Sequence, residues 1–303
     1  LRTIVVVAIF VTSFSSVVLS FGDLKQAAAI TANEIQAHIE FLASDELAGR
    51  LAGTKGAEKA GQYIASEFRS YGLKPVGDDG TFKQNFSFVA GVKPGRENML
   101  NWNAHGSARR FKAGEDFSPL AFSRDEPVEA EVVFAGYGIS APEVNYDDYA
   151  GVDVRGKIVL VLKNTPEGDD PRSKFQKYSS PRHKAVTARE KGAKGIILIA
   201  SEEKLRDDRL AALRYDQSFG DSGIAAVVVS RQVADAMLKE AGQNLTEVEK
   251  TLDSTKTTNS FPLPQSRLTC RTDVIKEMKA TANVVAVLEG SDPKLKGEII
   301  VVG

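Results

Sequence analysis

Four short apolar runs, rich in Val and Ile, constrain the fold of this 303-residue chain more than any other feature. Uncharged runs of β-branched residues with this length favour strands. Helical patterns follow at 184–191 and at 233–241, and each ends at a glycine. The sequence therefore predicts an α/β protein in which residues near 125–260 form a compact module of their own. The four apolar runs are 132–134, 158–162, 196–200 and 224–229.

Two further helices are predicted near the amino terminus. Thr31 and Glu34 have the spacing of a capping box, and apolar residues recur on one helical face over 32–43. A polar loop with two glycines follows at 44–54, and a second apolar stripe over 57–71 indicates another helix. Alternating phenylalanines then favour strand structure between 81 and 122.

The carboxyl-terminal part begins with a predicted connector at 254–266, which is rich in Ser and Thr and contains proline. Strand patterns return at 283–288 and 298–302. The last predicted strand reaches the end of the chain with no turn after it. Because an unpaired apolar strand invites aggregation, we expect a truncated polypeptide.

The balance of charged residues and the pattern of residues 1–23 indicate which partners the protein binds and where it is located. Lys and Arg total 39 against 40 Asp and Glu, so neither nucleic acid nor an anionic membrane is expected as a partner. Arg2 precedes an uncharged run at 3–21 and small residues before Asp23, which predicts a secretory signal peptide over 1–22. The protein would then be exported, periplasmic or extracellular, with only transient membrane contact. An uncleaved anchor is the alternative, which a mature protein that starts near Asp23 would exclude.

Motif searches give no self-contained catalytic site. The segment 151–158, GVDVRGKI, resembles a phosphate-binding loop, but it lacks the final Ser or Thr and leads into a strand rather than a helix. Gly136 and Gly138 are expected to serve a turn. The single cysteine, Cys270, has no histidine near it in the sequence, so we expect an inert, half-buried thiol. No Gly-x-Ser-x-Gly motif is present.

Histidines and acidic pairs are likewise expected to be structural or solvated. The three histidines, His38, His105 and His183, have no metal-ligand spacing to Cys, Asp or Glu. Three pairs of adjacent aspartates lie in hydrophilic, turn-like stretches and are expected to be solvated loops. These pairs are Asp147 with Asp148, Asp169 with Asp170, and Asp207 with Asp208. We therefore assign no catalytic, cofactor-binding or metal-binding residue.

Three ordered blocks resemble bacterial zinc aminopeptidases of the di-zinc exopeptidase clan, relatives of glutamate carboxypeptidase and the transferrin receptor. Residues 39–77, with the loop AGRLAGTKG, resemble the amino-terminal helix pair of that family. Residues 134–162, which begin FAGYGISAPEVNYDDYAG, and 183–199 are similar to its protease-associated insert domain. Residues 282–303 resemble the strand pair that enters the catalytic domain.

The resemblance implies an incomplete exopeptidase α/β domain with an inserted protease-associated α/β domain. It places amino-terminal peptidase elements at 23–124, the insert at 125–262 and the start of the catalytic domain at 263–303. In the family, the strand that matches 298–303 runs into a His-x-Asp motif that binds two zinc ions. No ligand can be carried onto this chain, so we expect these 303 residues to be inactive, with zinc and a peptide substrate belonging to the full-length protein. The alternative is a non-catalytic binding module.

Overall fold

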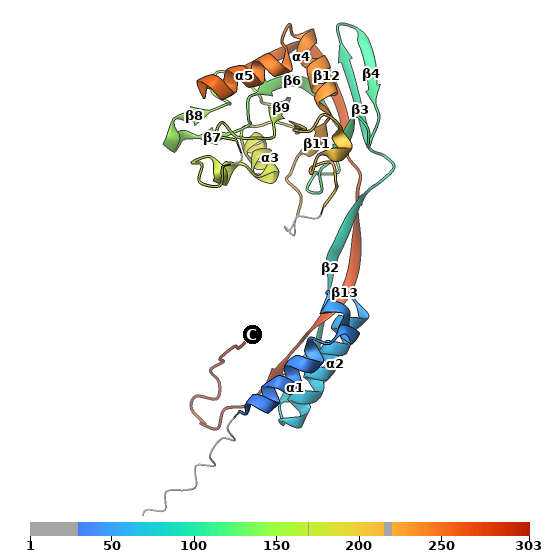
Figure 1. The fold of residues 1–303 in the computed structure, drawn as a ribbon, viewed down its shortest axis with the longest axis vertical. Coiled ribbons are helices and arrows are strands. Elements are labelled where there is room, and N and C mark those ends of the chain that lie inside the picture. Colours follow the sequence, from blue (N-terminus) through green and yellow to red (C-terminus); the bar gives the residue numbers. More distant parts are fainter. Residues whose placement is uncertain (1–29, 169, 215–219) are drawn as a thin grey trace, which may run out of the picture. The chain divides into compact units, whose positions relative to one another are not determined.

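The four Val- and Ile-rich runs form parallel neighbours at the centre of an eight-stranded mixed sheet (Figure 1). The computed structural model describes residues 30–168, 170–214 and 220–303. The parallel strands are β6 (Val128–Ala135), β9 (Ile158–Leu162), β10 (Gly195–Ile199) and β11 (Ala225–Val229). Every residue of β9, β10 and β11 is buried, as continuous apolar runs in a covered parallel sheet require.

Antiparallel strands extend this sheet on both sides. The order is β4-β3-β12-β6-β9-β10-β11-β5, so the parallel strands lie between two antiparallel flanks. The flanking strands are β3 (Met99–Ala104), β4 (Ser107–Phe111), β5 (Phe117–Pro119) and β12 (Ser260–Arg271). The α/β class predicted from the sequence is confirmed. The connector predicted over 254–266 is wrong, because much of it is β12, which pairs with both β6 and β3.

Helices cover both faces of the sheet, and each face has its own apolar core. On one face, α4 (Arg231–Glu240) and α5 (Leu245–Thr255) pack with residues such as Leu160 and Val227. On the other, α3 (Pro181–Glu190) packs with residues such as Val161 and Leu198. Alternate residues of one strand therefore supply opposite cores. The helices α3 and α4 agree with the sequence prediction, whereas α5 was not predicted.

Smaller elements complete this part of the chain. The strands β2 (Lys83–Pro94) and β13 (Val274–Val284) form an antiparallel pair, β1 (Lys74–Pro75) pairs with β14 (Ala286–Val287), and β7 (Ser140–Ala141) pairs with β8 (Tyr146–Asp147). Since β2 precedes β3 and β13 follows β12, the β2–β13 pair continues the pairing of β3 with β12. The strand predicted at 298–302 is wrong, because these residues are not in a strand and have no strand partner among the described residues.

The chain divides into two compact units, Leu1–Ile64 and Ala65–Gly303. In the first, α1 (Ala32–Leu42) begins at the predicted capping box of Thr31 and Glu34. The first turns of α2 (Lys55–Ser70) lie against the loop after α1, because a Cβ at Gly56 would be 1.9 Å from the carbonyl oxygen of Leu47. The predicted signal peptide lies outside the described residues. Within the described ranges, no helix is both long and apolar enough to cross a bilayer.

Candidate functional site

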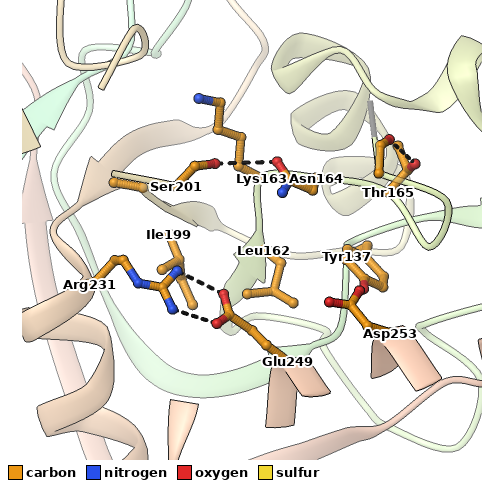
Figure 2. Close-up of a pocket in the computed structure, with 12 residues that line it drawn as sticks. Tyr137, Leu162, Lys163, Asn164, Thr165, Ile199, Ser201, Arg231, Glu249 and Asp253 are labelled. Atoms are coloured by element: carbon orange, nitrogen blue, oxygen red, sulfur yellow. Dashed lines mark hydrogen bonds and ion pairs between the residues drawn. The ribbon is translucent and has the colours of Figure 1, made fainter. Parts of the chain in front are cut away.

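A polar pocket of about 270 Å³ opens where the parallel strands end. Tyr137 follows β6, Leu162 ends β9 with Lys163 directly after it, and Ser201 follows β10. Loops that leave the carboxyl ends of adjacent parallel strands meet at one edge, which is where open α/β sheets bind ligands. Figure 2 shows the pocket. Its lining residues are Tyr137, Leu162, Lys163, Asn164, Thr165, Gly168, Ile199, Ala200, Ser201, Arg231, Glu249 and Asp253.

Tyr137 and Asp253 form one wall of the pocket. The Tyr137 hydroxyl donates a hydrogen bond of 2.6 Å to Oδ1 of Asp253, which is on α5. Burial and the hydrogen bond to Asp253 raise the pKa of Tyr137 well above its ordinary value. The phenol therefore stays protonated and remains a donor to the carboxylate.

Arg231 and Glu249 form the opposite wall through a bidentate ion pair (Figure 2). Nη1 of Arg231 is 2.8 Å from Oε1 of Glu249, and Nη2 contacts Oε2. The hydrogen bonds to Glu249 raise the pKa of Arg231. Two parallel N–H···O bonds fix the orientation of both side chains, so the charge of Glu249 is already balanced inside the site.

The rim after β9 carries amide and hydroxyl groups. Oγ of Ser201 donates to Oδ1 of Asn164 at 3.3 Å, and Oγ1 of Thr165 donates to the carbonyl of Gly168 at 2.7 Å. These groups supply donors and acceptors of the kind that recognise peptide units. The pocket therefore combines a hydrogen-bonding rim with two charged walls.

A buried lysine holds the backbone of this rim in place. Lys184, on α3, is 0% exposed, and its ammonium donates to three successive carbonyls, of Leu162 at 2.9 Å, Lys163 at 2.8 Å and Asn164 at 2.6 Å. Nothing in the sequence indicates this role, because Lys184 has the pattern of an ordinary polar position in a helix. The ammonium therefore supplies a hydrogen-bond donor to each of these three carbonyls at the end of β9.

Asp208 fixes the loop after β10. It is 1% exposed and accepts hydrogen bonds from the backbone of Ser201 at 2.7 Å and Leu210 at 2.8 Å, and from the ammonium of Lys163 at 3.2 Å. Burial acts to raise the pKa of Asp208, but these hydrogen bonds and the charge of Lys163 outweigh it and lower the pKa. The prediction that Asp208 is solvated is wrong, while its neighbour Asp207 is exposed as predicted.

Asp148 is also buried, at 0% exposure, so the prediction of a solvated loop is wrong for it too. Its Oδ2 accepts from the backbone N–H groups of Tyr137 and Ile139 at 3.0 Å each, and its Oδ1 accepts from the Tyr146 hydroxyl at 2.9 Å. Burial raises the pKa of Asp148 to about 7, against the opposing effect of these hydrogen bonds. Gly136 has a φ of +47°, and a Cβ there would be 2.2 Å from Oδ1 of Asp148.

The remaining acidic predictions concern Asp147, Asp169 and Asp170. Asp147 is half-buried and accepts from the ammonium of Lys191 at 3.0 Å, so it too departs from a fully solvated loop. Asp170 is exposed as predicted, and Asp169 lies outside the described residues. The segment 151–158 leads into β9, not into a helix, and Gly136 and Gly138 both have positive φ in a turn, as predicted.

The histidines occupy three separate places. Nδ1 of His38 is 2.7 Å from the Tyr63 hydroxyl within the first unit. His105 lies exposed between β3 and β4, and His183, on α3, packs edge-on against the ring of Tyr178. Among residues 30–168, 170–214 and 220–303, no group of three His, Cys, Asp or Glu side chains is arranged to hold a metal ion. The described residues therefore do not fit a zinc centre.

Cys270 is more deeply buried than predicted, at 3% exposure in β12. Burial raises the pKa of its thiol to about 12, so the reactive thiolate is scarce at neutral pH. We expect no reaction of the native protein with a chromogenic aromatic disulfide, and one equivalent of released thiolate in denaturant, since the chain has one cysteine. The absorbance of the released thiolate, followed after the disulfide is mixed with native or with denatured protein, measures both reactions. Rapid stoichiometric reaction of the native chain would contradict this burial.

The pocket residues on α5 were missed by sequence reasoning. Asn244 caps this helix by accepting from the backbone of Glu247 at 3.1 Å, and Leu245, Val248 and Leu252 form its buried face. An Asn cap three residues before Glu, followed by this apolar spacing, is the signal that could have identified the helix. Nothing in the sequence alone indicates that Glu249 and Asp253 would face the ends of β6 and β9.

Three solved structures are similar to this chain at low identity. An aminopeptidase from Aneurinibacillus sp. strain AM-1 is 22% identical, with a TM-score of 0.40, and the match covers 87% of this chain and 50% of that one. A zinc aminopeptidase from Bacillus subtilis is 17% identical, with a TM-score of 0.33, and the match covers 87% of this chain and 48% of that one. A peptidase M28 precursor from Shewanella amazonensis is 16% identical, with a TM-score of 0.34, and the match covers 85% of this chain and 53% of that one. The chain thus spans about half the length of these structures.

The sequence was also compared with curated proteins and with models of protein families, and one family model matches. A search of curated proteins finds no match. The sequence model of one family does match, over the segment that begins with β6 and extends into α4. This segment contains the four parallel strands and all of the pocket lining except Glu249 and Asp253. Residues 128–237 of this chain match the PA domain family.

Proposed function

We propose that this chain supplies the PA domain and the amino-terminal elements of an exported, zinc-dependent aminopeptidase. The observation that carries the proposal is the PA domain match at 128–237, which overlaps the middle of three sequence blocks that resemble such enzymes in the same order. Since the described residues do not fit a zinc centre, the proposal assigns the metal ligands to polypeptide other than these residues. Export rests on the signal-peptide pattern at 1–22.

In this proposal the two parts of the polypeptide have separate tasks. The catalytic part would release amino-terminal residues from peptides, with zinc to activate water for attack on the peptide bond. The PA domain would contact the peptide without taking part in bond cleavage. The pocket at the carboxyl edge of β6, β9 and β10 is the described feature best suited to that contact, because its polar groups converge in a concave site.

The chromogenic assay for aminopeptidases tests this function. The complete protein encoded at this locus, purified after export, should hydrolyse aminoacyl-nitroanilides. A zinc chelator should abolish the activity and added Zn²⁺ should restore it, because the bound metal supplies the reactive water. The 303-residue chain alone is expected to be inactive and serves as the matched control. Hydrolysis that persists in chelator, or none by the complete protein, would refute the proposal.

The second candidate function is a non-catalytic binding module, and the observation that favours it is the pocket within the chain itself. A binding module needs a concave polar site but no metal, and the pocket meets that need. The assay above separates the two candidates. A complete protein that binds peptides but never hydrolyses nitroanilides, whatever metal is supplied, would support the binding module.

A further inference from the structure

One charge in the pocket is not balanced. Four charged side chains line it, and three of them have ion-pair partners: Lys163 with Asp208, and Arg231 with Glu249. The fourth, Asp253, accepts the hydrogen bond from the Tyr137 hydroxyl, and within the described part of the chain it has no ion-pair partner. A hydrogen bond from a phenol orients a carboxylate but does not neutralise it.

Neither neighbouring cation pairs with Asp253: among the described residues, no ion pair joins it to Lys250, three positions before it on α5, or to Lys256, just after the helix. The ammonium of Lys256, three positions after Asp253, donates to the carbonyl of Pro166. On the far side of the pocket, the guanidinium of Arg231 is committed to Glu249 by its two terminal nitrogens (Figure 2). The Asp253 carboxylate, on an exposed residue, therefore lines the pocket without a cationic partner among the described residues, so a ligand cation can approach it.

The rest of the lining suits a peptide unit beside that cation. Asn164 and Ser201 present an amide and a hydroxyl, and Leu162 and Ile199 provide apolar surface at the strand ends. At about 270 Å³ the pocket is smaller than the roughly 300–1,000 Å³ of sites for drug-sized ligands. It fits one end or one side chain of a peptide rather than a folded protein.

We propose that this pocket binds the cationic group of a peptide, with Asp253 as its counter-ion and with Asn164 and Ser201 bonded to the adjacent peptide unit. The shared chemistry is an ammonium or guanidinium group, which comes either from a free amino terminus or from a basic side chain. The choice of a peptide as ligand rests on the proposed function. For an aminopeptidase, a basic side chain bound here would hold the substrate away from the bond that is cleaved, because the free amino terminus lies next to that bond.

Four short peptides distinguish the sources of the cation. All are amidated at the carboxyl terminus and based on Ala-Gly-Ala-Gly: one with a free amino terminus, one acetylated, one acetylated with a central Lys, and one acetylated with a central Glu. Binding to the isotope-labelled 303-residue chain is followed by amide chemical shifts. The free or the Lys peptide, or both, should shift resonances of residues 162–168 and 199–201, and the other two should not.

Variants test the assigned counter-ion. Asp253→Asn keeps the acceptor for Tyr137 but removes the charge, and should weaken binding about 10- to 150-fold, the range for loss of one hydrogen bond to a charged group. The matched control is Glu247→Gln, which removes the same charge from α5 at an exposed position outside the pocket lining. It should leave binding unchanged. Ser201→Phe, at an exposed rim position, should block binding by filling the pocket.

The outcomes are decisive in either direction. Binding that needs a cation, is weakened by Asp253→Asn and is unchanged in Glu247→Gln supports the proposal, and the peptide that binds identifies the source of the charge. Equal shifts from all four peptides, no shifts at millimolar peptide, or equal affinity in Asp253→Asn would overturn it. No zinc or hydrolysis is involved, so failure here would leave the aminopeptidase proposal standing, and failure of the nitroanilide assay would leave this site standing.

Discussion

Replacement of Lys184 with Met should lower the free energy of unfolding by about 3–5 kcal/mol, the range for breaking a buried, hydrogen-bonded charge. The two side chains have similar length, so packing changes little. The ammonium, however, donates to the carbonyls of Leu162, Lys163 and Asn164, and Met has no donor. Three carbonyls at the end of β9 would then lose their hydrogen bonds to the ammonium.

Urea denaturation of the 303-residue chain measures this loss. Lys194→Met is the matched control, because Lys194 is exposed just before β10 and its substitution removes the same charge. The control should change the free energy of unfolding by about 0.5 kcal/mol or less. If Lys184→Met were as stable as the control, the three hydrogen bonds would not hold the rim, and this part of the site description would be wrong.

Asp148 should make stability fall as pH rises from about 4 to about 7. Its pKa is raised by burial from 3.8 to about 7, so in this window the native state keeps a proton that the unfolded chain releases. A native state that binds more protons loses stability as pH increases. At about 1.4 kcal/mol per pH unit, the loss over the window is on the order of 2–4 kcal/mol.

Asp148→Asn isolates this contribution. Asn keeps an oxygen to accept from the backbone of Tyr137 and Ile139, and its amide can donate to the Tyr146 hydroxyl as a protonated acid would. The variant should match the parent near pH 4 and be more stable near pH 8. Other titrating groups, Asp208 among them, cancel in the difference between the two proteins. A difference independent of pH would show that Asp148 does not titrate in this window.

The centre of the fold could be predicted from sequence because burial there is complete. Strands covered on both faces must be apolar throughout, and β9, β10 and β11 were found from that property alone. By contrast, β12 contains Pro262 and Pro264 among polar residues and reads as a connector. It tolerates them because its pairing with β6 is interrupted between Pro262 and Arg267, where Gln265 has a φ of +52°.

The site could not be predicted, because its residues act through partners that are distant in sequence. Lys184 and Asp148 are charged residues of the kind usually found at the surface, and only the fold shows that both are at 0% exposure. Asp253 lies on α5, and its carboxylate accepts a hydrogen bond from Tyr137, which follows β6. A hydrogen bond of this kind depends on the packing of α5 over the sheet, which no local pattern in the sequence encodes.

The most direct test of the proposed function is mass spectrometry of a peptide after incubation with the complete protein encoded at this locus. We expect a ladder of products that lose residues one at a time from the amino terminus, while the same peptide with an acetylated amino terminus stays intact. Cleavage at internal bonds, or trimming of the acetylated peptide, would contradict it.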